Sequence, residues 1–291
     1  MRGKIIRMSL EYFFAPGDRP FPDTLTALEA GLLQPGCAWK TRAHLSQRVM
    51  TKLSVNLNKF ALLRNSRGKD VPNLVAMARR CIETGVQGIT VHPRPDQRHT
   101  RYQDVHDLAA VTAEHSVEFN IEGNPTPFFL DIVKKAKPTQ CTLVPDAPRQ
   151  LTSDHGWDLR VEGNRLRPII AELRQAGIRT SIFLDPDLAQ LDRVPATGAD
   201  RIELYTEAYA DAFGGNAQEE VFHKYRSAAV HAQQLGLGVN AGHDLSLKNL
   251  RLFLTIPGIL EVSIGHAIAV DSLDYGLENC LHRYLKIVQA T

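Results

Sequence analysis

The sequence predicts an α/β protein built as a closed (β/α)8 barrel, and three observations favour this fold. From Lys52 onward, short apolar runs rich in β-forming residues alternate with longer segments of helical period, as in parallel strands joined by crossover helices. Eight such units occupy about 240 residues, which suits a single barrel domain. Several helical segments also end in a glycine. An open doubly wound sheet remains the alternative, because the same alternation produces it.

The expected strands are short runs that follow one another along the chain: 53–56, 88–92, 117–121, 140–144, 179–184, 201–204, 238–240 and 261–264. Between them, apolar residues recur at three- and four-residue intervals, which predicts amphipathic helices such as 73–84, 166–176, 218–234 and 247–255. Glycine readily adopts the left-handed conformation of a helix C-cap. We therefore expect helices to end at Gly85, Gly177, Gly198, Gly236 and Gly258.

The 291-residue chain divides into two parts of different character. Residues 1–50 contain scattered prolines and no sustained apolar period, so we expect an N-terminal extension that is poorly ordered or arises from a mis-called start upstream of Met50. A targeting role is a weaker alternative, since the acidic residues do not suit a transit peptide. Residues 51–291 are expected to form the barrel as one catalytic domain.

Charge and cysteine content disfavour several classes of protein. The chain has 34 Lys and Arg and 32 Asp and Glu residues, of which seven basic and four acidic residues lie in the first fifty. The remaining 27 basic and 28 acidic residues make the main body nearly neutral, so no nucleic-acid partner is expected. The four cysteines form no C-x-x-C pair, which disfavours a zinc site or disulfide framework and suits a reducing cytoplasm. Without an 18-residue apolar stretch or a secretion signal, no membrane association is expected.

Groups suited to proton transfer or hydrogen bonding follow six of the eight expected strands. They are Asn56, His92, Arg94, Glu122, Glu203, Tyr205, Asn240, His243, Gly265 and His266. In a parallel barrel every strand ends at the same face, so these groups are expected to converge there. The helix–strand loops on the opposite side are mostly glycine with ordinary surface residues. This asymmetry favours an enzyme over an inert scaffold.

Two basic loops favour anion binding at this face. The segment 90–101, TVHPRPDQRHTR, places two histidines and three arginines after a strand, and guanidinium groups match the bidentate geometry of phosphate or carboxylate. The segment 56–68, NLNKFALLRNSRG, holds Arg64 and Arg67 and predicts a second anion site. A solvated surface loop is the alternative for each. No metal site is expected, because the first strand ends in Asn-Leu-Asn rather than the His-x-His of amidohydrolase barrels.

Three strand-end residues are candidates for acid–base chemistry or ligand binding. Glu122 in FNIEGNP follows an apolar strand, where desolvation would raise its pKa towards the range of a general base; a structural Glu–Arg pair is the alternative. His243 and His266 each follow a glycine, which lets the backbone approach a ligand closely. The loop after the eighth strand also binds phosphate in many barrels. A structural role is the alternative for either histidine alone.

Eight segments, in order between Lys52 and about Leu285, match one known family. They are VNLNKFALLRNSRG, GITVHPRPDQRH, NIEGNPT, CTLVPD, QLTSDHGWD, ADRIELYTEAYA, GLGVNAGHDL and EVSIGHAI. These segments resemble pyridoxine 5′-phosphate synthase of the deoxyxylulose-phosphate-dependent vitamin B6 route. The resemblance implies a TIM-barrel transferase that condenses 3-amino-2-oxopropyl phosphate with 1-deoxy-D-xylulose 5-phosphate into pyridoxine 5′-phosphate, inorganic phosphate and water. It also implies no metal or organic cofactor and a homo-octamer built from dimers.

Carried over residue by residue, the resemblance implies roles for fourteen positions. His92 and Glu122 would be acid–base groups, and His243 the proton donor. The aminoketone phosphate would be contacted by Asn56, Arg67, Asp244, Gly265 and His266. The deoxyxylulose phosphate would be held by Arg94, His99 and Thr152, with Glu203 near the ring-forming atoms. Asn58 and Lys59 stand where some family members have Asp-His against the sugar phosphate; lysine can meet an anion but lacks the ring geometry of histidine.

Two other functions stay open. Another phosphate-handling barrel, such as an isomerase or synthase of amino-acid biosynthesis, would share the glycine of the eighth strand end. It would not require the His-Pro-Arg and Ile-Glu-Gly strand ends together, and incubation with the two substrates separates the cases. A catalytically inactive barrel that serves as a binding or assembly module would tolerate alanine at the polar strand ends.

Overall fold

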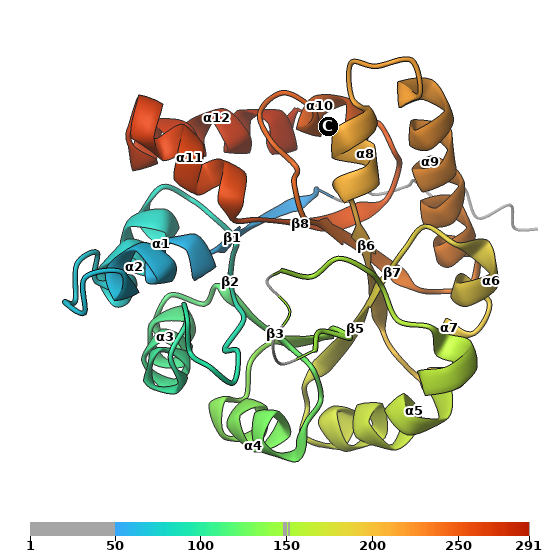
Figure 1. Ribbon diagram of the computed structural model, residues 1–291, viewed down its shortest axis with the longest axis horizontal. Coiled ribbons are helices and arrows are strands. Elements are labelled where there is room, and N and C mark those ends of the chain that lie inside the picture. Colours follow the sequence, from blue (N-terminus) through green and yellow to red (C-terminus); the bar gives the residue numbers. More distant parts are fainter. Residues whose placement is uncertain (1–49, 148–149, 151, 291) are drawn as a thin grey trace, which may run out of the picture. The chain divides into compact units, whose positions relative to one another are not determined.

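The computed structural model describes residues 50–147, 150 and 152–290, and this part of the chain contains a closed barrel of eight parallel strands (Figure 1). The strands are β1 (Lys52–Asn56), β2 (Gly88–Val91), β3 (Glu118–Gly123), β4 (Gln140–Leu143), β5 (Arg179–Leu184), β6 (Arg201–Tyr205), β7 (Gly238–Gly242) and β8 (Ile259–Ile264). Their order around the barrel follows the sequence, and β1 closes it by pairing with β8, with Val55 opposite Ile264. The predicted barrel is confirmed, and the open-sheet alternative is wrong.

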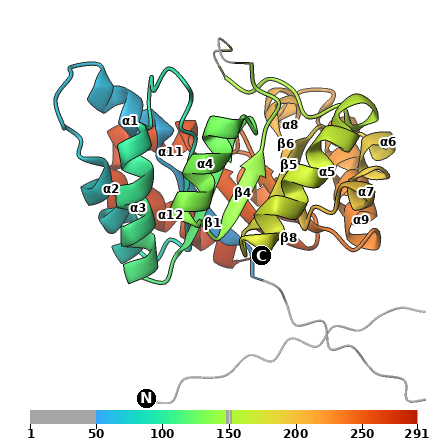
Figure 2. The ribbon, with the colours of Figure 1, turned by 90° about the horizontal axis from the view of Figure 1, so that it is seen from below.

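Helices form an outer ring around the strands, as the side view shows for α3, α4 and α5 (Figure 2). They are α1 (Asn58–Asn65), α2 (Leu74–Glu83), α3 (Tyr102–Glu114), α4 (Pro127–Ala136), α5 (Leu159–Gln175), α6 (Leu188–Leu191), α7 (Val194–Thr197), α8 (Glu207–Ala212), α9 (Gln218–Gln234), α10 (Leu250–Phe253), α11 (His266–Tyr275) and α12 (Leu277–Gln289). No helix of the described residues is long and apolar enough to cross a membrane. The expectation for residues 1–50 concerns a segment that, except for Met50, lies outside the described residues.

Local capping chemistry explains where several helices begin and end. Asn73 caps α2, since its side-chain oxygen accepts a hydrogen bond from the backbone N–H of Ala76 at 2.8 Å. All five predicted C-terminal glycines have φ between +75° and +95°, which confirms their expected conformation. The helix predicted at 247–255 is wrong in length, because α10 covers only Leu250–Phe253.

The strands alternate between apolar residues that face the helices and polar residues that face the barrel interior. Leu53 and Val55 of β1 belong to the fully buried apolar core. Between them, the hydroxyl of Ser54 lies 2.7 Å from that of Thr90 on β2, and both are buried. Further buried polar side chains in the strands are Asn120, Gln140, Thr142, Ser181, Glu203, Asn240 and Glu261. Because side chains alternate along a strand, the apolar layer lies outside the barrel and a polar, partly acidic interior lies under its strand ends.

Candidate active site

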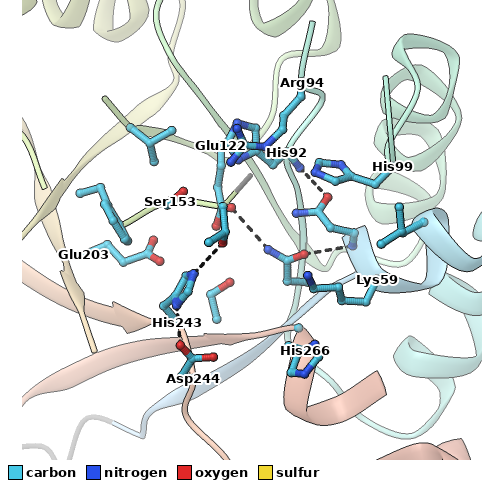
Figure 3. Close-up of a pocket in the computed structure, with 18 of the residues that line it drawn as sticks. Lys59, His92, Arg94, His99, Glu122, Ser153, Glu203, His243, Asp244 and His266 are labelled. Carbon is cyan, nitrogen blue, oxygen red and sulfur yellow. Dashed lines mark hydrogen bonds and ion pairs between the residues drawn. The ribbon is translucent and has the colours of Figure 1, made fainter. Parts of the chain in front are cut away.

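A cavity of about 460 Å³ lies at the C-terminal ends of the strands, where the sequence predicts the site (Figure 3). Thirteen of the fourteen predicted site residues line it: Asn56, Asn58, Lys59, His92, Arg94, His99, Glu122, Thr152, Glu203, His243, Asp244, Gly265 and His266. They come from β1, β2, β3, β6, β7, β8 and the segments that follow them, and from the segment after β4, which supplies Thr152. The fold thus brings these residues together, while their individual roles stay predictions.

Arg67 is the predicted site residue that does not line this cavity; it is exposed just after α1. Arg64 is fully buried instead, and its guanidinium donates hydrogen bonds of 2.6 and 2.8 Å to the two carboxylate oxygens of Asp104 on α3. It also donates to the carbonyl oxygen of His99 at 3.3 Å. Arg64 therefore ties the end of α1 to the basic loop, and its interpretation as part of an anion site is wrong.

Asn56 and Asn58 hold the ends of β1 and β2 in register. The side-chain oxygen of Asn58 accepts hydrogen bonds from the backbone N–H of His92 and the hydroxyl of Thr100, both at 2.9 Å. The side-chain oxygen of Asn56 accepts from the backbone N–H of Asn58 at 3.0 Å, and its amide donates to Glu122 at 3.4 Å. Since Asn58 acts as an acceptor, an aspartate could make the same two bonds, which explains why asparagine is compatible with this position.

Two carboxyl groups in the cavity have strongly raised pKa values. For Glu122, desolvation raises the pKa well above its usual value, and the nearby charges of Glu203 and Asp146 add to the effect. Burial and the charge of Glu261 raise the pKa of Glu203 to about 8. The expectation that desolvation raises the pKa of Glu122 is confirmed. Glu203 therefore keeps its proton at neutral pH, and Glu122 holds its proton to a higher pH than a free glutamate does, as acid–base catalysis requires.

Two histidines that line the same cavity have lowered pKa values. Burial, followed by the charge of Arg94, lowers the pKa of His92 well below its usual value and that of His99 to about 4. Arg94 is itself buried, forms an ion pair with Asp146 and donates to the carbonyl oxygen of Gln150 at 3.1 Å. His92 and His99 are therefore neutral at pH 7. In His99 the lone-pair nitrogen is Nδ1, which accepts a hydrogen bond from the backbone N–H of Thr100 at 2.9 Å.

Two glycines bring the strand ends of the site close together. A Cβ atom on Gly242 of β7 would lie 2.3 Å from Oε1 of Glu203, so the carboxyl group occupies the space that a side chain would need. A Cβ atom on Gly265 would lie 3.0 Å from Cβ of Asn56. Gly265 also caps the N-terminus of α11, whose first residue is His266. A helix N-terminus beside a cavity favours bound anions.

Some residues that line the cavity were not among the predicted site residues. Arg98 and Ser153 extend its polar wall, while Val144 and Phe183 form an apolar one. Arg98 belongs to the basic loop that the sequence identified, so its charge was a usable signal. No pattern distinguishes Phe183 from the other apolar residues of β5. Among the described residues, no three His, Cys, Asp or Glu side chains converge as ligands of a metal ion would.

The closed parallel barrel has one cavity at its strand ends, lined by carboxyls of raised pKa, neutral histidines and cationic side chains. This arrangement defines a TIM-barrel enzyme of acid–base chemistry on anionic substrates. The family model described as Pyridoxal phosphate biosynthesis protein PdxJ matches residues 53–290, and the chain belongs to this family. The family resemblance seen in the sequence is thereby confirmed.

Curated relatives match over almost their whole length. A protein of Flavobacterium johnsoniae is 52% identical over 239 residues, which cover 81% of this chain and 99% of the relative. One from Bacteroides fragilis is 52% identical over 236 residues (81% and 98%), and one from Xylella fastidiosa 48% over 254 residues (84% and 97%). All three are named pyridoxine 5′-phosphate synthase.

Solved structures of other enzymes share the fold at low identity. Thiamine phosphate pyrophosphorylase from Pyrococcus furiosus has a TM-score of 0.54 and 14% identity, and the match covers 84% of this chain and 97% of that one. Phosphoribosylanthranilate isomerase from Thermotoga maritima has a TM-score of 0.51 and 10% identity, with 83% and 100% covered. These likenesses support the barrel fold alone.

Proposed function

We propose that this protein is a pyridoxine 5′-phosphate synthase, which condenses 3-amino-2-oxopropyl phosphate with 1-deoxy-D-xylulose 5-phosphate and releases pyridoxine 5′-phosphate, inorganic phosphate and water. The observation that carries the proposal is the position of His92, Glu122 and His243 around one cavity of about 460 Å³. This volume suits two small phosphorylated substrates side by side. Membership of the family and the names of its curated relatives support the same reaction.

The reaction begins when the amine of the aminoketone attacks the ketone carbon of the deoxypentulose. Proton transfer and loss of water then convert the carbinolamine into a Schiff base. Elimination of phosphate, closure of the second ring bond and aromatisation each move further protons on and off carbon or oxygen. Such a sequence needs several groups that exchange protons near neutral pH, which is the property that burial gives to Glu122 and Glu203.

In this proposal, Glu122 and neutral His92 exchange protons with the substrates from the ends of β3 and β2. His243, at the end of β7, donates a proton to a leaving oxygen. The proposed contacts to the aminoketone phosphate are Asn56, the backbone N–H of Asp244, Gly265 and His266, and those to the deoxyxylulose phosphate are Asn58, Lys59, Arg94, His99 and Thr152. Glu203 lies deeper, beside Gly242, where the ring-forming atoms would lie.

The test is formation of pyridoxine 5′-phosphate by the full chain supplied with both substrates. Glu122→Gln keeps the shape of the side chain but removes its proton, so we expect turnover to fall by about 100- to 10,000-fold. The matched control is Glu220→Gln on the exposed side of α9, which should turn over like the wild type. Absence of product from the wild-type chain, or wild-type rates in both Glu122→Gln and His243→Ala, would contradict the proposal.

We further propose that residues 51–291 suffice for catalysis. The family match begins at residue 53, and relatives covered to 98% or 99% of their length align with only 81% of this chain. A chain that starts at Met50 should therefore keep the turnover number of the full chain, measured in the same assay.

We also propose a cytoplasmic homo-octamer. Exposed apolar side chains support assembly, because Leu62 and Leu63 of α1 and Val270 and Leu273 of α11 lie on two helices that contact each other. Such a surface is typical of an interface between subunits. The buried cysteines of the described residues are unpaired, which suits a reducing compartment. Sedimentation equilibrium gives the mass of the assembly and tests its size.

A further inference from the structure

His243 lies between two polar partners at the end of β7, with Asp244 beside it in Figure 3. Its Nδ1 lies 2.8 Å from Oδ2 of Asp244, and its Nε2 lies 3.1 Å from the hydroxyl of Thr152. The hydrogen bond from His243 lowers the pKa of Asp244, so Asp244 is an ionised carboxylate that can only accept. Nδ1 therefore carries a proton, and Nε2 is the nitrogen that faces the cavity.

An aromatic side chain restrains the imidazole ring on a further side. The ring of Tyr205 meets that of His243 edge-on, with centroids 5.0 Å apart and planes at 75°. Tyr205 packs in turn against Phe183 at 5.2 Å, and its hydroxyl donates a hydrogen bond to Glu207. The His243 ring is thus held by an acceptor, a hydroxyl and an apolar wall.

The backbone that places Asp244 beside His243 is unusual. His243 and Asp244 have φ of +83° and +59°, a region that residues other than glycine rarely adopt. The buried hydroxyl of Thr206 donates to the carbonyl oxygens of Gly242, at 2.8 Å, and of His243. The side chain of Asn249 donates to the carbonyl oxygen of Asp244 at 3.1 Å. Such strain persists only where the surroundings hold it, and it is concentrated at functional sites.

We propose that Asp244 is a positioning residue for His243, rather than a side chain that contacts substrate phosphate. This inference rests on the proposed function. The family resemblance would place Asp244 against the aminoketone phosphate, but an ionised carboxylate and a phosphate dianion repel each other at contact distance. Only the backbone N–H of Asp244 is suited to meet that anion. The side chain is already engaged, because it accepts the proton on Nδ1 of His243.

The carboxylate of Asp244 serves the chemistry of His243 in two ways. It fixes the tautomer and the orientation of the ring, so that Nε2 faces the substrates. It also stabilises the imidazolium that exists before His243 donates its proton from Nε2. An aspartate plays the same part beside the histidine of serine proteases, where its replacement by asparagine lowers turnover by about 10,000-fold.

Two substitutions separate the positioning role from a phosphate contact. Asparagine and glycine both tolerate left-handed φ, so Asp244→Asn and Asp244→Gly keep the backbone and change only the side chain. We expect kcat to fall by roughly 100- to 10,000-fold, while KM for the aminoketone phosphate changes less than about two-fold. The control is Asp211→Asn, at an exposed position of α8, which should leave both constants unchanged. A raised KM with kcat retained would assign the side chain to phosphate binding and overturn the inference.

A second measurement needs neither substrate nor turnover. The ¹⁵N shifts of the His243 ring, assigned by their loss in His243→Gln, should report an Nδ1–H tautomer in the wild-type chain. In Asp244→Gly the ring should move towards the Nε2–H form. An unchanged tautomer in Asp244→Gly would overturn the inference. Failure of the wild-type chain to make pyridoxine 5′-phosphate would instead count against the proposed function and leave the tautomer result standing.

Discussion

Replacing Glu261 by glutamine is expected to make the fold more stable at alkaline pH. Glu261 is buried in the barrel interior on β8, paired in register with Lys52 and Asn240. Its Oε1 has no hydrogen-bond partner among the described residues. Burial, and then the charge of Glu118, raise the pKa of Glu261 to about 7, although Arg201 opposes the shift. The carboxyl group is therefore neutral in mildly acidic solution and ionised in alkaline solution.

The size of the effect follows from the shift in pKa. A rise in pKa from the ordinary value of 4.5 to about 7 corresponds to roughly 3 kcal/mol, at about 1.4 kcal/mol for each pH unit. Because the folded-state pKa lies above the unfolded one, the folded state holds this proton more tightly. The resulting stabilisation is complete below pH 4.5 and is lost as the pH rises through about 7. Glutamine stays neutral at every pH and so avoids the loss.

Urea unfolding at about pH 5 and about pH 9, followed by circular dichroism, measures the difference. The free energy of unfolding of Glu261→Gln, relative to the wild type, should rise by roughly 3 kcal/mol between the two pH values. Removing the charge of Glu261 also eases ionisation of Glu203, which acts in the same direction. The exposed Glu220→Gln should show no such rise. A constant difference between Glu261→Gln and the wild type at both pH values would refute the reasoning.

Two further substitutions test the geometry of the site. Gly242→Ala places a Cβ where the carboxyl group of Glu203 lies, 2.3 Å from Oε1, so we expect kcat to fall at least about ten-fold while urea unfolding changes little. Wild-type turnover in this variant would mean that the position of the Glu203 carboxyl group does not affect catalysis. Asp104→Asn leaves the charge of Arg64 buried without its carboxylate, so urea unfolding should report a loss of about 3–5 kcal/mol. A raised KM with unchanged stability would instead return Arg64 to an anion-binding role.

The strands were predictable because each is a short apolar run closed by a polar residue or glycine. All eight expected strands lie within two residues of the observed bounds at either end. The first and last residues of the helices were harder to predict from the sequence, since they depend on single capping side chains. The expected helix at 166–176 is the second part of α5, which begins at Leu159 because the side chain of Asp158 caps it. In the segment 247–255, Asn249 accepts a hydrogen bond from the backbone N–H of Ser246, and α10 begins only after it.

The site was predictable as far as strand ends determine it. The rule that parallel strands end at one face places residues as distant in sequence as Asn56 and His266 around one cavity. Contacts between particular side chains could not be predicted from the sequence in the same way. From the sequence alone, Arg64 resembles an exposed cation, because nothing indicates that it pairs with Asp104, forty residues further along the chain. His243 and Asp244 are sequence neighbours, whose side chains meet here because both residues adopt positive φ, and no sequence pattern predicts that conformation.

The loss of stability at alkaline pH and the proposed acid–base chemistry both follow from the burial of carboxyl groups. Burial in the polar barrel raises the pKa values of Glu122, Glu203 and Glu261, so these carboxyls weaken the fold as the pH rises. The same burial lets Glu203 keep its proton at neutral pH and makes Glu122 hold its proton more tightly, and the proposed condensation depends on such protons. Glutamine at all three positions would make a barrel that is more stable in alkaline solution and lacks its carboxyl proton carriers. A chain selected for stability alone would have little reason to keep them, so their presence in the interior favours a catalytic role for the cavity above.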